Sequence, residues 1–324
     1  MYHIIVNPAS RTGKGKKIWS DLEPVLVDRG EEYKVLFSKK AGHVIELVEE
    51  LSNSVLADSP DSILKLIILG GDGTLNEALQ GITDFSRVQI GYIPTGSSND
   101  FARDLKLPPS PVECLKKILD CKTPTHMDLG VLQYNETSKQ LSRLHGSKLL
   151  NKRYFDVSCG IGYDAAVCEE ALVSKIKKVL NRFGLGKLVY LCIALKQLIQ
   201  NKNCNCVMTL DDTQKLELPN FLFAAMMVHQ YEGGGFKFCP YADYQDGIID
   251  VCAVSGISKL TVLMALPKAM QGKHYKYKGI ERYSAKKIDI VTDAPYWVHT
   301  DGEVSMKTSS ITITCEKQAI SLLV

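Results

Sequence analysis

Short, largely apolar runs alternate with helical patterns along the first third of the chain. Four such runs have the length of strands, at residues 2–6, 33–37, 64–69 and 88–93. Apolar residues recur at helical spacing between them, at residues 16–29, 43–51 and 74–81. Strands separated by helices are typical of a parallel sheet whose two faces are covered. The pattern therefore predicts an α/β Rossmann-like N-terminal domain.

The pattern changes at about residue 126, where short strand-like runs with turn signals between them take over. These runs cover residues 155–159, 206–210, 221–228, 248–254, 287–292, 297–300 and 310–315. Two helical stretches interrupt them, at 165–200 and 260–271. We predict a mainly antiparallel β-sandwich C-terminal domain over residues 126–315. The first domain covers residues 1–125, and a tail at about 316–324 returns to it.

Length and composition favour two soluble domains with an active site in the cleft between them. The 324 residues exceed what one hydrophobic core usually organises. A net charge of +3 does not indicate nucleic-acid binding. The ten cysteines form no CxxC pair, so we expect free thiols and a cytoplasmic protein. No signal-peptide pattern follows Met1, and the apolar run at 188–195 is too short to span a bilayer.

Residues 70–74 read GGDGT and join a predicted strand to a predicted helix. Their glycines allow close backbone approach and the positive φ angles that direct N–H groups at phosphate oxygens. The helix that begins near Thr74 adds its N-terminal partial charge. A carboxylate beside phosphates, such as Asp72, needs a cation between them or a proton to accept, and phosphoryl transfer meets that need. The alternative is a tight turn in which Asp72 only caps the helix.

Residues 94–103 read PTGSSNDFAR and follow the next predicted strand. In a parallel sheet, both segments then lie at the carboxyl ends of strands, where ligands bind. Small hydroxyls and a glycine can bond to phosphate or ribose, and Asn99 and Asp100 can orient a second ligand. Asn99 and Asp100 can equally well be the start of a capped helix.

These segments, GGDGTLNEAL at 70–79 and PTGSSNDFARDL at 94–105, resemble the diacylglycerol kinase catalytic-domain family. This family of soluble bacterial lipid kinases is related to sphingosine kinases, and the resemblance covers nearly the whole chain. Residues 7–10 (NPAS) resemble its opening nucleotide loop. The loop continues RTGKGKK, whereas the family has Gly-Lys directly after the serine. That departure leaves open which of Arg11, Gly13 and Lys14 contacts the nucleotide.

Three later segments extend the resemblance. Residues 128–130 (DLG) resemble the aspartate at the domain junction, and residues 301–303 (DGE) resemble the catalytic acidic triplet. The glycines at 233–235 open a segment similar to the second-domain signature, whose further members are Pro240, Asp243, Asp246 and Gly247.

The resemblance implies an ATP- and Mg²⁺-dependent kinase that phosphorylates the hydroxyl of a membrane lipid, with diacylglycerol as the first expectation. Asp72, Asp100 and Asp128 would belong to the network that holds the catalytic Mg²⁺ and the phosphates. Glu303 would be the general base, with Asp301 beside it. The implied ATP contacts are Asn7, Pro8, Ala9, Ser10, Ser38, Gly70, Gly71, Asp72, Gly73, Thr74, Leu75, Asn76, Ser97 and Asn99.

A second, structural Mg²⁺ is implied at the Asp246 carboxylate and the main-chain carbonyls of Asp243 and Ile248. The residues alone leave this open, because three aspartates within 243–250 also suit a solvated turn. Residues 301–303 likewise suit an ordinary hairpin turn between two short strands. A general base is needed opposite the nucleotide, which is the reason to favour a catalytic role there.

Two basic segments are candidates for peripheral contact with the inner face of a membrane. Residues 268–287 hold seven basic residues and one acidic residue, 7 − 1 = +6. Residues 175–196 are basic and strongly apolar, as in an interfacial helix. The alternatives are a solvated face for the first and a core helix for the second. A homodimer is left open.

Two other functions remain as alternatives. A kinase of a soluble acceptor such as NAD is one, since GGDGT also occurs in NAD kinases, although PTGSSNDFA and the second domain argue against it. A nucleotide-sensing module without turnover is the other, and the presence of every expected carboxylate argues against it. The sequence does not specify which lipid is the acceptor.

Overall fold

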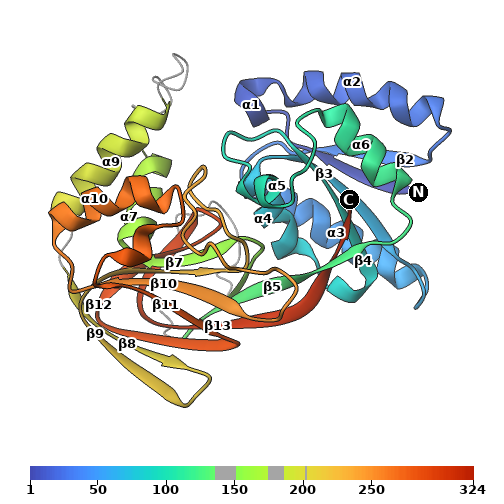
Figure 1. The fold of residues 1–324 in the computed structure, drawn as a ribbon. Coiled ribbons are helices and arrows are strands. Elements are labelled where there is room, and N and C mark those ends of the chain that lie inside the picture. The colour runs from blue at the N-terminus through green and yellow to red at the C-terminus, as the bar shows by residue number, and fades with distance from the viewer. Residues whose placement is uncertain (136–150, 174–185, 201–202) are drawn as a thin grey trace.

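The computed structural model describes residues 1–135, 151–173, 186–200 and 203–324. Figure 1 shows a parallel-sheet half that carries both termini and a β-rich half beneath α7, α9 and α10. The helices α7 (Tyr163–Val173), α9 (Gly186–Gln200) and α10 (Lys259–Ala269) belong to this second half. Within the described residues, no helix is both long and apolar enough to cross a membrane.

Four parallel strands form the first half, as the apolar runs predict. They lie in the order β2 (Tyr33–Phe37), β1 (Tyr2–Val6), β3 (Leu64–Gly70) and β4 (Val88–Pro94). The helices of this half are α1 (Ser10–Gly13), α2 (Gly15–Asp28), α3 (His43–Asp58), α4 (Asp72–Gly81), α5 (Asp100–Asp104) and α6 (Pro111–Asp120), with the 3₁₀ turn η1 (Phe85–Arg87). Helix α3 extends seven residues beyond the predicted end at residue 51.

Alternate residues of these strands supply two separate cores. Ile5, Leu66 and Ile68 pack with α3 and α4, whereas Ile4 and Ile67 pack with α2 and α6. Figure 1 shows these helix pairs on opposite faces of the sheet. Because helices cover both faces of the sheet, the strands are apolar along their whole length. For this reason the strands could be predicted from the sequence.

The second half is antiparallel, as predicted. Its strands are β5 (Thr125–Tyr134), β6 (Lys152–Phe155), β7 (Ser158–Gly162), β8 (Cys204–Leu210), β9 (Gln214–Met227), β10 (Ile249–Ser255), β11 (Ile280–Ala285), β12 (Lys287–Thr300) and β13 (Glu303–Leu323), with the 3₁₀ turn η2 (His274–Lys276). All ten cysteines are free.

Several predicted boundaries in this half were wrong. The runs at 287–292 and 297–300 are one strand, β12, whose register shifts between Val291 and Tyr296. The run at 155–159 spans the break between β6 and β7. Strands β5 and β11 were missed. The helical stretch at 165–200 contains α7 and α9, and residues 174–185 between them lie outside the described residues.

Strand β13 joins the two halves. It pairs with β12 and β5, shifts register between Glu316 and Ile320, and then pairs Ser321–Leu323 in parallel with β4. The shift places Gln318 at φ 54°, and its amide donates to Asp128 Oδ1 at 2.7 Å. The fully buried Asp128 carboxylate thus holds the point where the strand leaves the sandwich for the parallel sheet.

Candidate active site

The loop between β3 and α4 lies at the carboxyl end of the parallel sheet. A Cβ at Gly70 would lie 2.4 Å from the Thr74 Cβ, and one at Gly71 would lie 3.1 Å from the Cα of Gly96. Glycine is therefore required here by close packing. The prediction of positive φ angles here was wrong, because Gly70, Gly71 and Gly73 all have φ below zero.

Hydroxyl and amide side chains from three loops meet beside this glycine turn. Asn7 Nδ2 donates to Thr74 Oγ1 at 2.9 Å, and Thr95 Oγ1 donates to Ser10 Oγ at 2.9 Å. Ser10 Oγ in turn donates to the Asn7 carbonyl at 2.8 Å. The opening loop, the GGDGT turn and the loop after β4 thus form one polar rim at the N-terminus of α4.

Asp72 is the first residue of α4, and its carboxylate is tied to the first half of the chain. Tyr92 Oη donates to Oδ1 at 3.3 Å and the Asp100 amide donates to Oδ2 at 3.2 Å. Burial, and then the charges of Asp100 and Asp301, raise the pKa of Asp72 from 3.8 to about 7. Asp72 is therefore a carboxylate whose ionised form needs a nearby positive charge.

Asp100 begins α5 and links it to the second half. Its Oδ2 accepts from the Gly234 amide at 2.7 Å and its Oδ1 accepts from Arg103 at 2.8 Å. Gly234 lies in the triple-glycine loop, at φ 83°. Burial raises the pKa of Asp100, although these donors oppose the shift. Asn99 precedes the helix at φ 48°, and its side chain bonds within its own loop, to Gly96.

Asp301 and Gly302 form a two-residue turn between β12 and β13, with φ angles of 50° and 81°. Asp301 Oδ1 accepts from the amides of Val157 and Ser158 at 3.0 and 2.9 Å. Oδ2 accepts from the Asp156 amide at 3.2 Å and from Asn76 at 2.7 Å. The hairpin turn is confirmed, and the catalytic role of residues 301–303 stays a prediction.

Glu303 follows that turn and lies against the GGDGT loop. A Cβ at Gly73 would lie 2.7 Å from Glu303 Oε1. The charge of Asp301, two residues before Glu303, reaches Asp72 and contributes to its raised pKa. Residues more than 200 positions apart in the sequence thus place their carboxylates at one location.

The side chains of Leu75 and Asn76 pack or bond in the interior and do not contribute to the polar rim. Leu75 is in the hydrophobic core. The fully buried Asn76 donates to Asp301 and to the Tyr154 carbonyl, and accepts from Arg153 at 2.9 Å. Arg153, which sequence reasoning missed, also reaches Thr300 Oγ1 at 3.1 Å. This buried network fastens α4 to β6 and to the end of β12.

Asp156 is a second residue that sequence reasoning missed. It is 2% exposed, and neither carboxylate oxygen has a hydrogen-bond partner among the described residues. Burial, and then the charge of Asp301, raise the pKa of Asp156 well above its usual range, and Asp72 adds to the effect. Asp156 directly follows the strand residue Phe155 and belongs to no recognisable motif. Its neighbours in sequence therefore do not indicate a functional role.

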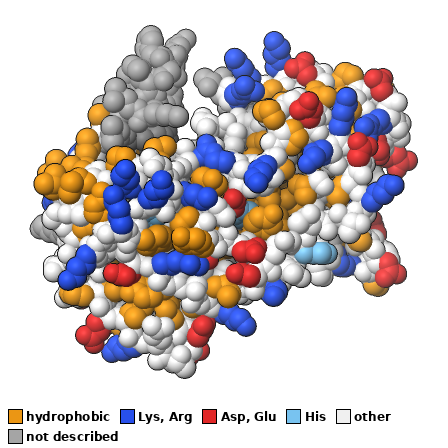
Figure 2. Space-filling view, in the orientation of Figure 1, with side chains coloured by type: hydrophobic (Ala, Val, Ile, Leu, Met, Phe, Trp, Pro, Cys, Tyr) orange, Lys and Arg blue, Asp and Glu red, His pale blue; other side chains and the backbone are white. Residues whose placement is uncertain are grey.

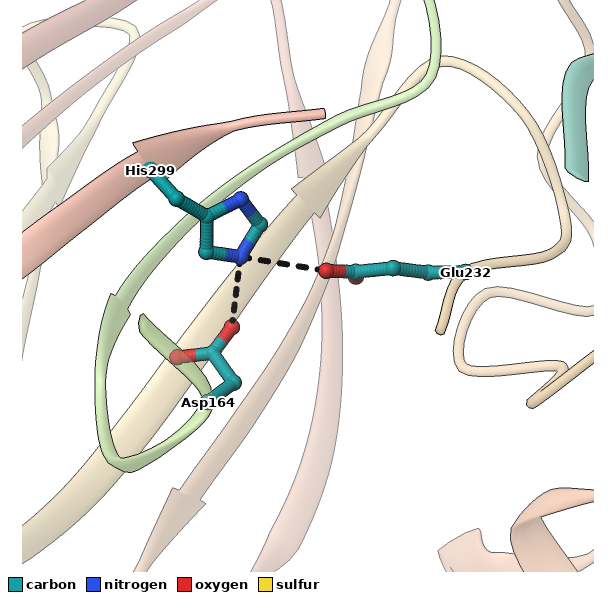
Figure 3. Close-up of side chains that lie close together, drawn as sticks. All are labelled: Asp164, Glu232 and His299. Atoms are coloured by element: carbon teal, nitrogen blue, oxygen red, sulfur yellow. Dashed lines mark hydrogen bonds and ion pairs between the residues drawn. The ribbon is translucent and has the colours of Figure 1, made fainter. Parts of the chain in front are cut away.

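His299, with Asp164 and Glu232, is a third group that sequence reasoning missed, and it contacts the turn at 301–302. His299 Nε2 lies 3.3 Å from Asp164 Oδ2 and 3.1 Å from Glu232 Oε1, as Figure 3 shows. Gly302 donates its amide proton to His299 Nδ1 at 3.1 Å. Nδ1 therefore carries no proton, and the ring proton lies on Nε2, between the two carboxylates. Only glycine fits at 160, where a Cβ would lie 2.3 Å from His299 Nε2.

Asp128, which was grouped with Asp72 and Asp100, bonds to the backbone of the second half and of β13. Its Oδ2 accepts from the Gly247 amide at 2.6 Å and its Oδ1 from Gln318. Its charge contributes, after burial and Asp243, to the raised pKa of Asp246. Strand β5 thus carries Asp128 to the turn before β10.

The expected structural metal site is a turn of oxygen-bearing residues. Asp246 Oδ1 accepts from the Ile248 amide at 2.9 Å, and the Asp243 carbonyl accepts from the Asp246 amide at 3.4 Å. Asp243 and Asp246 are exposed. The turn offers carboxylate and carbonyl oxygens of the kind that Mg²⁺ binds.

Of the remaining predicted contacts, Ser38 is buried directly after β2, with its amide bonded to the Val6 carbonyl at 3.0 Å. Ser97 is exposed in the loop after β4. Pro8 and Ala9 lie in the opening loop, where the Ala9 amide donates to Asn7 Oδ1 at 3.0 Å.

The donor set at the rim fits Mg²⁺. Asp72, Asp100 and Asp156 would provide hard oxygen ligands, and both oxygens of the buried Asp156 lack partners among the described residues. Burial, and then neighbouring carboxylates that include Asp301, raise the pKa of Asp72 and of Asp156. A divalent cation would offset the charge of these carboxylates.

The fold combines a parallel-sheet half that carries a glycine turn with an antiparallel sandwich. Each half matches a domain found in kinases. Residues 1–132 match the diacylglycerol kinase catalytic domain, and residues 157–324 match the YegS C-terminal NAD kinase beta sandwich-like domain. The chain belongs to the diacylglycerol kinase catalytic-domain family, which confirms the resemblance seen in the sequence.

Relatives and solved structures agree with this assignment. YtlR of Bacillus subtilis, which is named as a lipid kinase, is 26% identical over 305 residues, 94% of this chain and 93% of that protein. A diacylglycerol kinase of Staphylococcus epidermidis is 27% identical over 94% of this chain and 86% of its own length. A diacylglycerol kinase structure from Bacillus anthracis shares the fold, with a TM-score of 0.70 at 22% identity over 99% of this chain and 96% of that one. Yeast NADH kinase in complex with NADH matches with a TM-score of 0.52 at 11% identity, over 99% and 82% of the two chains.

Proposed function

We propose that this protein is an ATP- and Mg²⁺-dependent lipid kinase that phosphorylates the hydroxyl of diacylglycerol or a related lipid alcohol. The observation that carries the proposal is the meeting of Asp72 with the 301–303 turn at Gly73. A phosphoryl-transfer site needs a metal-binding carboxylate next to the phosphates and a base next to the acceptor. The names of the relatives support the acceptor class.

The nucleotide would lie on the polar rim. The ten-residue helix α4 directs its N-terminus at the rim, and the hydroxyls of Ser10, Thr74 and Thr95 are small acceptors and donors for phosphate or ribose. The close approach of Gly71 to Gly96 keeps Cβ atoms away from that position. We assign ATP contacts to Asn7, Pro8, Ala9, Ser10, Ser38, Gly70, Gly71, Gly73, Thr74, Ser97 and Asn99, and to Leu75 and Asn76 through their backbone only.

We assign the catalytic Mg²⁺ to Asp72, Asp100 and Asp156, where it would neutralise the phosphate charge. We keep a structural Mg²⁺ at Asp246, with the carbonyls of Asp243 and Ile248, as a separate proposal. For Asp128 we propose a structural role, because a backbone amide bonds to each of its oxygens at the bend in β13.

In the proposed reaction the acceptor hydroxyl oxygen forms a bond to the γ-phosphorus of ATP. The bond from that phosphorus to the bridging oxygen breaks, and ADP leaves. Glu303 accepts the hydroxyl proton, and Asp301 holds the turn that carries Glu303. The protein contributes position and charge compensation, because phosphoryl transfer proceeds through a loose transition state.

A transfer assay tests the proposal. Radiolabelled ATP with diacylglycerol in mixed micelles should give labelled phosphatidic acid. Glu303→Gln and Asp72→Asn should each lower kcat by a factor of about 10² or more. Glu46→Gln, an exposed residue of α3, is the matched control and should be unchanged. Normal turnover by either site variant would refute the role of that residue.

NAD is the second candidate acceptor, because the fold is shared with yeast NADH kinase. The same assay with NAD in place of diacylglycerol separates the two. Labelled NADP without labelled lipid would replace the lipid-kinase proposal.

We further infer a cytoplasmic enzyme that meets its acceptor at the inner face of the membrane. The ten free cysteines suit a reducing compartment. A homodimer stays a prediction.

A further inference from the structure

Helix α10 is apolar on its outward side as well as its inward side. Val262, Ala265 and Ala269 pack into the core between the sandwich and its covering helices. On the other side, Leu260 and Met264 are 67% and 49% exposed. A surface helix of a globular protein normally carries polar residues on its outward side. The outward side of α10 therefore lacks the composition that water alone would favour.

The exposed apolar residues of α10, with its neighbour Met270 and the end of α9, make up what we call the α10 face. Its members are Ile199, Leu260, Leu263, Met264 and Met270. Lys259 Nζ donates to the Ile199 carbonyl at 2.6 Å, which joins the end of α9 to the start of α10. Figure 2 shows hydrophobic side chains gathered over these two helices, with lysine or arginine side chains beside them.

The charge around the α10 face has one sign. Residues 259–278 contain five lysines and neither aspartate nor glutamate. Four of these lysines, at 259, 273, 276 and 278, are exposed. Apolar side chains next to exposed lysines are typical of a helix that lies in the headgroup region of an anionic bilayer.

A second copy of the chain fits the α10 face less well. In a two-fold dimer the same surface meets itself, so the lysines of one copy would oppose those of the other. Lysine is also depleted at the centres of protein interfaces. Anionic lipid headgroups offer the opposite charge, and acyl chains offer the apolar phase.

We propose that the α10 face docks this protein on an anionic lipid bilayer, with the apolar side chains inserted and the lysines among the headgroups. The proposal rests on the proposed function only in that a lipid acceptor would lie in the same bilayer. It specifies which surface of the sandwich half faces the membrane.

Vesicle sedimentation without nucleotide tests the docking surface directly. The full chain should sediment with vesicles of equal parts phosphatidylglycerol and phosphatidylcholine, and much less with pure phosphatidylcholine. The double variant Leu260→Glu/Met264→Glu should bind the anionic vesicles at least about tenfold more weakly. Lys273→Glu/Lys276→Glu should lose most of the preference for phosphatidylglycerol. Val291→Glu, at a 52% exposed site on β12, is the matched control and should bind normally.

Three results would overturn the proposal. Equal vesicle binding by the Leu260→Glu/Met264→Glu variant and the Val291→Glu control would remove the α10 face from the contact. Failure of the unaltered protein to bind anionic vesicles would exclude docking altogether. Dissociation of an oligomer by the double variant without lipid, measured by light scattering after size exclusion, would make the face a contact between copies.

A kinase assay on a short-chain diacylglycerol dispersed in water keeps the two proposals apart. The double variant should phosphorylate this acceptor as fast as the unaltered protein, which also shows that it is folded. Vesicle binding without any lipid phosphorylation would refute the proposed function and leave the docking surface intact.

Discussion

The Asp72 carboxylate couples stability to function at the scale of a single residue. Its folded pKa of about 7 exceeds the ordinary 3.8, so ionisation of Asp72 costs the folded state free energy. The sign follows: the cost is absent below about pH 4, grows as the pH rises to about 7, and is constant above that. A site residue held in this way lowers the stability of the protein without metal.

Asp72→Asn should therefore stabilise the protein at high pH while abolishing kinase activity. The shift, 7 − 3.8 = 3.2, corresponds to at most about 4 kcal/mol of unfolding free energy at pH 8. Thermal melting in EDTA at pH 4 and pH 8 measures it. The variant should melt higher than the unaltered protein at pH 8 and close to it at pH 4. A variant that melts lower at both values would show that Asp72 is not penalised by burial.

His299 separates two contacts that can be tested one at a time. Nδ1 accepts from the Gly302 amide, and Nε2 donates to Asp164 and Glu232. The side-chain oxygen of asparagine can occupy the position of Nδ1, whereas a glutamine amide reaches the position of Nε2. His299→Asn therefore keeps the contact to the turn, and His299→Gln keeps the contact to the carboxylates.

If His299 positions the turn before Glu303, His299→Gln should lower kcat by about tenfold or more, and His299→Asn should lower it less. The KM for ATP should be unchanged in both, because the nucleotide rim lies in the other half. His126→Ala, at an exposed histidine of β5, is the control. Equal losses in both variants, with a raised KM for ATP, would indicate a general loss of structure instead.

At the scale of elements, sequence reasoning succeeded where a strand is determined by its own residues. Strand β3 is apolar because both its faces are covered, so its limits were predicted to within one residue. Strand β12 was divided in two, because its register shift at Val291 depends on pairing with β13 and β8. Strand β5 was missed, since its pairing with β13 depends on residues about 180 positions away.

The candidate site shows the same limit. The GGDGT turn and the 301–303 turn each carry a local pattern, and the family resemblance assigned a role to both. Their meeting at Gly73 is a property of the folded chain. Asp156 and His299 were missed because burial and distant partners, rather than neighbours in sequence, determine what they do.

The bend in β13 gives a prediction for Asp128. Asp128→Ala would leave the amides of Gly247 and Gln318 without their buried acceptor, at about 1–3 kcal/mol each. The melting temperature should fall by several degrees, whereas kcat of the folded protein at low temperature should change by less than about threefold. Asp243→Ala, an exposed neighbour, should melt normally in EDTA. A loss of kcat as large as that of Asp72→Asn would return Asp128 to the catalytic network.

At the scale of the whole molecule, several connections make the two halves depend on each other, and three of them lie at the site or in the sheet. Strand β13 crosses from the sandwich to β4, Asn76 bonds to Asp301 at 2.7 Å, and the Gly234 amide bonds to Asp100 at 2.7 Å. The first is covalently continuous and the other two are buried or half-buried. Carboxylates from both halves meet at the site, so an opening between the halves would also dismantle it.

The two tryptophans, Trp19 in α2 and Trp297 in β12, test whether the halves unfold together. Trp297→Phe leaves a fluorescence probe in the parallel half, and Trp19→Phe leaves one in the sandwich. Leu322→Ala is then added to each of these two proteins, because truncating this 1% exposed side chain at the end of β13 costs about 2–5 kcal/mol. If the halves unfold together, the Trp19 and Trp297 signals should move to the same lower urea midpoint. If only the Trp19 signal moved to lower urea, the halves would unfold separately. The site would then depend on a docking equilibrium between two independently stable domains.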